Sequence, residues 1–321
     1  MFRPSVCIVT PALAAANNGN WQTASRWARM LRRYYRVALV DRWQGEPADA
    51  LIALHARRSA DSIERWARER TGRPLVVALT GTDLYRDILV DAEAQRSLDL
   101  ADRLVVLHEL AIDDLPARHR AKAVACFQST TRRAALAKTP QHLRAVMVGH
   151  LREEKAPQTY FGAARRLVGR ADIRLDHIGA ALDAAFGAEA AALQQACPNY
   201  RWLGALPHEA TRRYIQRAHV LVHTSRIEGG AHVVMEAICS GTPVLATRIA
   251  GNVGMLGRDY RGFFEPGDAD GLAGLLERCR DEPAILHALG EQCAARAPLF
   301  EPGREQAGLL ALLNDLLENS R

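Results

Sequence analysis

Two glutamates eight positions apart, Glu228 and Glu236, bracket the stretch of the chain with the clearest chemical pattern. The apolar run Val220–Val222 leads into a polar turn with glycines, and Gly241 follows the helical segment that carries Glu236. The turn thus joins the carboxyl end of a strand to the amino end of a helix, where free N–H groups and the helix dipole favour anionic ligands. Ligands of open α/β sheets bind at such edges. Glutamates beside a helix are also common as solvated charges, so a structural interpretation stays open.

Basic residues follow another apolar run at the start of the second half. Val148 leads into Gly149 and His150, and then into Arg152 and Lys155. A strand that enters a glycine and then cationic side chains can cradle a diphosphate, with lysine as a point charge and arginine as a fork. For any single residue of this string, a solvated loop charge is the alternative.

The turn after the first expected strand is rich in asparagine. It contains Asn17, Asn18, Gly19 and Asn20, directly before an amphipathic helix pattern. Amide side chains can hydrogen-bond a sugar or an acceptor substrate, but they also cap helices and stabilise turns.

Two further polar groups follow the third and fourth expected strands. His55 ends one strand and precedes Arg57 and Arg58, and Thr82 and Asp83 follow the next strand. A histidine that faces a cleft can polarise or deprotonate an acceptor, although a histidine at a strand end is more often structural. The adjacent arginines would suit a small phosphorylated substrate. The sequence places both groups at the same edge of a sheet.

Apolar runs alternate with helical patterns along the whole chain, which predicts an α/β fold of βαβ units with mostly parallel sheets. Residues 128–142 are polar and are interpreted as a linker between two Rossmann-like halves with a cleft between them. The strands expected before the linker are Val6–Thr10, Val37–Asp41, Ala50–Leu54, Leu75–Thr80, Leu104–Leu107 and Ala123–Phe127. Those expected after it are Ala145–Val148, Ile173–Ile178, Arg201–Gly204, Val220–His223 and Val244–Thr247. The helices expected include Trp21–Arg33, Ser59–Arg70, Asp91–Leu100 and a closing stretch, Arg304–Asn319.

Length and composition fit a protein of two domains. The 321 residues suffice for two cores of about 150 residues each. The net charge of +6 comes from scattered arginines, which suits phosphorylated substrates better than nucleic acid. The six cysteines form no CxxC pair, so we expect reduced thiols and a cytoplasmic protein. We interpret Val6–Thr10 as a strand rather than a secretory leader, and no apolar run is long enough to predict a membrane span.

The string Ser225–Thr247 resembles the signature of retaining GT-B glycosyltransferases, in which Glu, seven residues and Glu precede a Gly-x-Pro strand restart. The resemblance implies that Glu228 and the amides of Gly229 and Gly230 hold the donor sugar. It also implies that Glu236 takes the ribose hydroxyls of the nucleotide. Gly230 replaces the aromatic residue that is usual in this family, which leaves sugar selectivity open.

Two other strings extend this resemblance. The string from Gly149 to Lys155 is similar to the family element Gly-Arg-Leu-x-x-x-Lys, whose Arg and Lys bind the donor phosphates. Lys155 matches, whereas His150 replaces the arginine and carries less charge near neutral pH, so Arg152 could compensate. Gly19 matches the glycine loop that lies against the transferred sugar and phosphates. The domains implied are an acceptor domain at 1–135, a nucleotide-sugar domain at 143–300, and a helix at 301–321 that returns to the first domain.

The strings Thr10–Thr23, Leu54–Ala60 and Thr80–Asp87 carry a narrower resemblance, to the selenosugar synthases of selenoneine biosynthesis. These GT-B enzymes transfer a sugar from a UDP-sugar to selenophosphate and form a carbon–selenium bond. The resemblance implies transfer of glucose or N-acetylglucosamine, release of UDP, and no metal or other cofactor, because the UDP-sugar is a co-substrate. Nucleic acid and membranes are not expected as partners.

The resemblance also implies roles for individual residues. Lys155, Arg152 and helix-end amides would stabilise the departing UDP without a metal. The residues expected to take part in catalysis are His55, Lys155 and Glu228. The residues expected to bind the acceptor are Asn17, Asn18, Asn20, Arg57, Arg58, Thr82 and Asp83.

Three alternatives remain at this stage. The chain could be an ordinary glycosyltransferase that uses a hydroxyl group of a sugar, lipid or small molecule as acceptor. It could be a UDP-sugar 2-epimerase, or a catalytically silent binding subunit on the same fold.

Overall fold

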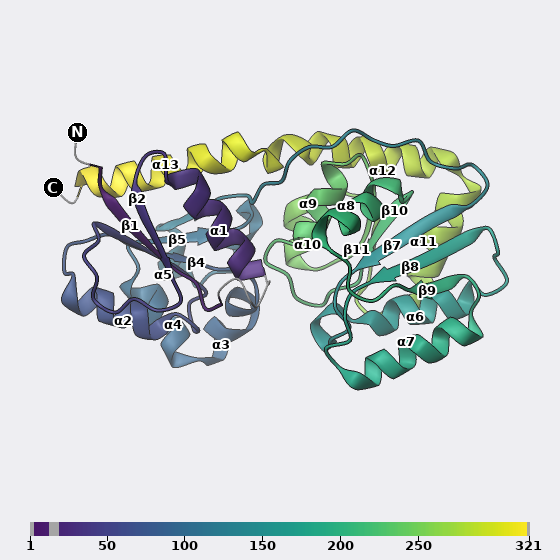
Figure 1. Cartoon of the computed structure of the whole chain (residues 1–321), viewed down its shortest axis with the longest axis horizontal. Helices are drawn as coiled ribbons and strands as arrows, with labels where there is room; N and C mark the ends of the chain where they lie inside the picture. Colours follow the sequence, from purple (N-terminus) through teal and green to yellow (C-terminus); the bar gives the residue numbers. More distant parts are fainter. Residues whose placement is uncertain (1–2, 13–18, 320–321) are drawn as a thin grey trace. The chain divides into compact units, whose positions relative to one another are not determined.

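The computed structural model describes residues 3–12 and 19–319, which form two compact α/β units. Each unit contains one six-stranded sheet with helices packed against it (Figure 1). Unit 1 comprises Met1–Ser129, Glu228–Gly230 and Pro302–Arg321, and unit 2 comprises Thr130–Ile227 and Ala231–Glu301.

The sheet of unit 1 has the strand order β2-β1-β3-β4-β5-β6, and every neighbouring pair is parallel. The central strand β3 is buried at every position because helices cover both of its faces. The strands are β1 (Ser5–Val9), β2 (Arg36–Val40), β3 (Ala50–Leu54), β4 (Leu75–Ala78), β5 (Arg103–Val106) and β6 (Ala123–Ala125).

Two apolar clusters form the core of unit 1, and alternate residues of the strands belong to different clusters. Helices α1 and α13 supply one cluster with Trp27 and Leu313, whereas α2 and α4 supply the other with Trp66 and Leu98. The helices are α1 (Gly19–Leu31), α2 (Ala60–Glu69), α3 (Ile88–Val90), α4 (Ala92–Leu100), α5 (Ala117–Arg120) and α13 (Pro302–Asn319), with a π-helix η2 (Asp83–Asp87) and a 3-10 helix η3 (Glu109–Ile112).

Glu305 fixes the last helix, α13, to the rest of unit 1. Its buried carboxylate accepts hydrogen bonds from Arg26 Nε (2.9 Å), Trp27 Nε1 (2.6 Å) and the backbone N–H of Ser129 (2.9 Å). These donors come from α1 and from the chain after β6. A buried carboxylate is stable only with such partners, so the network specifies where α13 begins to pack.

The sheet of unit 2 has the strand order β12-β11-β10-β7-β8-β9 and is also parallel throughout. Its strands are β7 (Leu143–Val148), β8 (Ile173–Ile178), β9 (Tyr200–Trp202), β10 (Val220–His223), β11 (Val244–Thr247) and β12 (Phe263–Phe264). Its helices are α6 (Pro157–Arg166), α7 (Ala184–Ala196), α8 (His208–Arg217), α9 (His232–Ile238), α10 (Ala250–Leu256), α11 (Ala269–Asp281) and α12 (Pro283–Arg296), with 3-10 helices η4 (Glu153–Lys155) and η5 (Ala297–Phe300).

The predicted α/β class, the two parallel sheets and the packing of the closing helix in the first unit are confirmed. Strands β3, β8, β10 and β11 have the predicted bounds. The elements that were not predicted include the two-residue strand β12 and the π-helix η2. All six cysteines are free and buried. No helix within residues 3–12 and 19–319 has the length and hydropathy needed to cross a membrane.

Candidate active site

His55 directly follows β3 and has a left-handed backbone with φ of 73°. This conformation is unfavourable for a residue with a side chain, by about 1–2 kcal/mol. The surroundings hold it in place, since the His55 N–H donates to Ala78 O (2.8 Å) and the imidazole is buried. Nε2 lies 3.2 Å from Thr82 Oγ1, and Nδ1 accepts from the Arg58 N–H at 3.4 Å. Strained backbone conformations are more frequent at functional sites than elsewhere, so the left-handed conformation is consistent with a functional role for His55.

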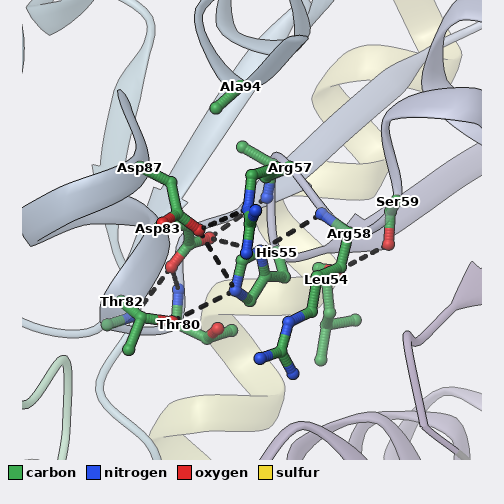
Figure 2. Close-up of polar contacts among 12 residues, drawn as sticks. Leu54, His55, Arg57, Arg58, Ser59, Thr80, Thr82, Asp83, Asp87 and Ala94 are labelled. Atoms are coloured by element: carbon green, nitrogen blue, oxygen red, sulfur yellow. Dashed lines mark hydrogen bonds and ion pairs between the residues drawn. The ribbon is translucent and has the colours of Figure 1, made fainter. Parts of the chain in front are cut away.

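Asp83 connects the ends of strands β3 and β4. Its carboxylate has no solvent exposure, and Oδ1 accepts from the N–H groups of Thr80 and Gly81, both at 2.9 Å. Oδ2 accepts from the Ala56 N–H at 3.1 Å. Figure 2 shows this carboxylate between the two strand ends, beside the His55 ring. Asp83 was expected to bind the acceptor; both of its oxygens accept from backbone N–H groups, and its role toward an acceptor stays a prediction.

Asp87 is the second buried carboxylate beside His55, at the end of η2. Its Oδ2 accepts from Arg57 Nε at 3.1 Å and lies 3.8 Å from His55 Nε2. Its Oδ1 accepts from Arg86 Nε at 3.0 Å. Asp87 therefore contacts two guanidinium groups and faces the imidazole, as Figure 2 shows for Arg57 and His55. Neither Arg86 nor Asp87 was among the expected site residues.

The protonation of His55 follows from these neighbours. Burial lowers the pKa of His55, the carboxylate of Asp83 raises it in part, and the net shift is downward. A neutral imidazole whose Nδ1 accepts the Arg58 N–H carries its proton on Nε2. In this tautomer His55 is a hydrogen-bond donor toward Thr82, which suits polarisation of a bound group better than removal of a proton.

The remaining expected residues of the first half are Asn17, Asn18, Gly19, Asn20 and Arg58. Asn17 and Asn18 lie outside the described residues. Gly19 and Asn20 begin α1. The Arg58 side chain is exposed and points away from Asp83 and Asp87 (Figure 2).

In unit 2, the expected phosphate-binding string follows β7. The Gly149 carbonyl accepts from His177 Nε2 at 3.1 Å, and the backbone of Gly179 packs so closely that a Cβ there would lie 2.0 Å from the Gly149 oxygen. His150 Nδ1 accepts from the Ala180 N–H at 3.0 Å. Burial, with the nearby charges of Arg152 and Lys155, lowers the pKa of His150. At neutral pH His150 therefore offers an uncharged Nε2–H donor instead of the positive charge of an arginine.

Lys155 lies in η4, where two hydrogen bonds connect this 3-10 helix to the residues after β10. Thr224 Oγ1 donates to Lys155 O at 2.7 Å, and the Arg226 N–H donates to Glu154 O at 2.9 Å. Strands β7 and β10 are neighbours, so Lys155 is fixed at the carboxyl edge of the sheet. Arg152 is exposed and lies 3.8 Å from Glu154, so its guanidinium is only weakly constrained.

Glu236 lies on α9 and is 6% exposed. His208 Nε2 is 2.7 Å from Glu236 Oε1, and this hydrogen bond raises the pKa of His208. The Arg212 guanidinium lies 3.9 Å from the same oxygen and is anchored on Thr131 through two hydrogen bonds, of 3.0 and 2.8 Å. In the part of the chain that the structure describes, Oε2 of Glu236 has no hydrogen-bond partner. The carboxylate is thus held through one oxygen, and the other remains available.

His208 and Arg212 were missed by the sequence analysis, because they precede Glu236 by 28 and 24 positions. Glu228, Gly229 and Gly230 form part of the loop between β10 and α9, as expected from the strand–turn–helix pattern.

Comparison with known proteins identifies the family. Residues 128–296 match the family described as glycosyl transferases group 1, which is more than half of the chain. The chain belongs to this family and is a glycosyltransferase with the GT-B fold. No curated protein sequence matches it.

Solved structures show the same fold at low sequence identity. Sucrose-phosphate synthase from Thermosynechococcus elongatus is 16% identical with a TM-score of 0.81, and the similarity covers 99% of this chain and 100% of that one. HepE of Anabaena, solved with UDP and glucose, is 14% identical with a TM-score of 0.74, over 98% of this chain and 100% of that one. A glycosyltransferase from Rickettsia africae is 14% identical with a TM-score of 0.73, over 99% of each chain.

Proposed function

We propose that the chain is a selenosugar synthase that transfers glucose or N-acetylglucosamine from a UDP-sugar to selenophosphate. The observation that carries this proposal is the cationic cluster after β3 and β4, in the segments that resemble the selenosugar synthases. There Arg57 and Arg58 follow His55. Among the described residues, the Arg57 side chain donates one hydrogen bond, from Nε to Asp87, so its two terminal nitrogens remain available. A small anion with a phosphoryl group fits such donors.

The donor half of the proposal rests on unit 2. HepE of Anabaena has been solved with UDP-glucose, so UDP-sugars are accommodated by this fold in a protein similar to ours. We assign the ribose hydroxyls to the available Oε2 of Glu236, and the diphosphate to Lys155 with the Nε2–H of His150. Lys155 would stabilise the negative charge that develops on the departing UDP.

In the proposed reaction, selenium attacks the anomeric carbon as the bond from that carbon to the UDP oxygen breaks. UDP leaves with the electron pair, and the phosphoryl group is later lost from selenium to water, which gives the selenol. Selenophosphate is already anionic and polarisable, so no strong general base is required. The buried, neutral His55 with its proton on Nε2 agrees with this requirement. Because the six thiols are free, we assign the reaction to the cytoplasm.

The proposal is tested by mass spectrometry of reactions that contain UDP-glucose or UDP-N-acetylglucosamine with selenophosphate, thiophosphate or phosphate. We expect UDP and a selenium-containing sugar only when selenophosphate is present, with thiophosphate as the nearest substitute. UDP release with a hydroxyl acceptor alone would establish an ordinary glycosyltransferase instead. Conversion of the UDP-sugar to its C2 epimer would establish the epimerase alternative.

A further inference from the structure

We propose that Arg57 and Arg86, held together by Asp87, form the subsite for the phosphoryl group of the acceptor. This inference rests on the proposed function, which supplies the phosphoryl acceptor, and it adds residues that the sequence pattern did not single out. The subsite lies at the carboxyl edge of β3 and β4, where ligands of parallel sheets bind.

The contacts of Asp87 carry the proposal. Each of its oxygens accepts from the Nε of a different arginine, Arg57 at 3.1 Å and Arg86 at 3.0 Å. One carboxylate therefore brings two guanidinium groups to the same place. Only 5% of the Asp87 side chain is exposed, so this arrangement is supported by the protein interior.

The outer parts of both arginines remain available for a ligand. Across residues 3–12 and 19–319, the terminal nitrogens of Arg57 and Arg86 make no hydrogen bond. Their side chains are 40% and 46% exposed. An arginine that is held through Nε keeps its terminal N–H groups for a second partner, and such groups recognise a phosphoryl group in pairs.

The charge balance favours an anion at this position. Asp83 is occupied by three backbone N–H groups, so Asp87 is the carboxylate that contacts the two arginines. Counting Asp83 as well, three arginines (Arg57, Arg58 and Arg86) face two carboxylates (Asp83 and Asp87), which leaves one excess positive charge. This excess attracts an anionic phosphoryl group.

Preorganisation explains why a buried carboxylate belongs in an anion site. Long arginine side chains lose conformational entropy when a ligand orders them. Asp87 restricts both side chains before the ligand arrives, and η2 fixes Asp87 itself. Asp87 is thus a positioning residue, and Arg57 and Arg86 are the ligand-binding residues.

The test compares Arg57→Ala, Arg86→Ala and Asp87→Asn with Arg65→Ala as a matched control. Arg65 is held through Nε by Glu69 at 2.9 Å and its side chain is 40% exposed, as for Arg57, but it lies on α2. Thiophosphate binding is measured by calorimetry with the donor site saturated by UDP, and the selenophosphate KM is measured in turnover. For Arg57→Ala and Arg86→Ala we expect the thiophosphate Kd and the selenophosphate KM to rise about tenfold or more. The Kd for UDP of these variants should stay near that of wild type. Arg65→Ala should have the Kd and the KM of wild type.

The Asp87→Asn variant separates positioning from a general structural effect. It should raise the selenophosphate KM more than it lowers kcat, with the circular dichroism spectrum unchanged. Arg86→Lys provides a folded control that keeps the charge without the fork, and it should recover only part of the affinity.

The outcomes distinguish the subsite from the proposed function. Wild-type protein that binds thiophosphate through these arginines but forms no selenosugar would refute the proposed reaction and keep the anion site. Selenosugar formation with arginine variants that match Arg65→Ala in both constants would refute the subsite and keep the reaction. If UDP-saturated wild-type protein fails to bind thiophosphate at millimolar concentration, the subsite is likewise refuted.

Discussion

Glu236 and Asp87 are both carboxylates that lie almost entirely out of solvent and face cationic side chains. They nevertheless present different groups to a ligand. Glu236 is held through Oε1 by His208 and keeps an available oxygen, which suits hydroxyl groups. Asp87 uses both oxygens on arginines, so the guanidinium groups are what remains available, and these suit an anion. Two carboxylates thus suit opposite kinds of ligand, because one oxygen of Glu236 and both oxygens of Asp87 have hydrogen-bond donors among the described residues.

The role assigned to Glu236 predicts weaker UDP binding in Glu236→Gln. Loss of a charge-assisted hydrogen bond in a buried position costs about 1.5–3 kcal/mol, which is a factor of about ten or more in Kd. Glutamine keeps the volume of the side chain, so the fold around Arg212 should survive. Calorimetry with UDP measures the effect. Glu209→Gln is the control, since Glu209 also pairs with an arginine but its side chain is 71% exposed; a Kd equal to that of this control would remove Glu236 from the donor site.

His150 predicts a specific pH dependence. Because burial and the neighbouring cations lower its pKa, the ring is neutral from about pH 6.5 upward. The ratio of the UDP dissociation constants of wild type and His150→Gln should therefore stay constant between about pH 7 and 8. Protonation of His150 should strengthen UDP binding by the wild type, relative to His150→Gln, only as the pH falls below this range. A ratio that changes steadily from pH 7 to 8 would show that the charged imidazole binds the diphosphate. The variant His150→Arg should bind UDP at least as well as wild type.

At the scale of elements, the buried strands were predictable because apolar runs bounded by polar turns have few other interpretations. Ala50–Leu54 and Val220–His223 form strands with the expected bounds. The π-helix Asp83–Asp87 was not predictable, since the buried place of its first residue involves a tertiary hydrogen bond from the Ala56 N–H, after another strand. The pairing of Glu236 with Arg212 depends in the same way on tertiary structure. The sequence therefore indicated which segments reach the site edge, but not which of their side chains are occupied there.

The closing helix α13 gives a prediction for stability. Glu305→Gln should destabilise unit 1 by about 3 kcal/mol, because it leaves the buried donors of Arg26, Trp27 and Ser129 without a charged acceptor. Urea unfolding followed by tryptophan fluorescence is a suitable measurement, since Trp27 is one of the donors. Glu318→Gln changes an exposed glutamate of the same helix and serves as the control. If the two variants unfold at the same urea concentration, the network does not hold α13 in place.

At the scale of the whole molecule, both units follow one plan: a parallel sheet whose carboxyl edge carries the candidate residues. Unit 1 places His55 and Asp87 after β3 and β4, and unit 2 places Lys155 after β7. Each edge also contains a buried histidine whose pKa is lowered by burial, His55 in unit 1 and His177 in unit 2. Burial therefore disfavours the protonated form of both histidines in the folded protein, which makes the free energy of unfolding depend on pH.

His177 should make the largest single contribution to this link. Its side chain has no solvent exposure, its Nδ1 contacts Tyr200 Oη at 3.1 Å and its Nε2 contacts Gly149 O at 3.1 Å. Burial lowers the pKa of His177 from 6.5 to about 4. The unfolded chain therefore binds a proton at a higher pH than the folded chain, so stability is complete above pH 6.5 and is lost as the pH falls toward 4. The loss from this one residue is about 3 kcal/mol.

The measurement is the free energy of unfolding in urea between pH 7 and 4.5, for wild type and His177→Gln. Glutamine can still donate toward the Gly149 carbonyl, but it takes up no proton in this range. Other histidines with a lowered pKa contribute to the wild-type slope, among them His55, His119, His142, His150 and His219. The variant should therefore be less stable than wild type at pH 7. Its free energy of unfolding should fall less steeply with decreasing pH, because it takes up as many as one proton fewer on unfolding. The stabilities of the two proteins should therefore approach each other as the pH falls. Parallel curves for the two proteins across the whole range would show that His177 does not titrate with unfolding.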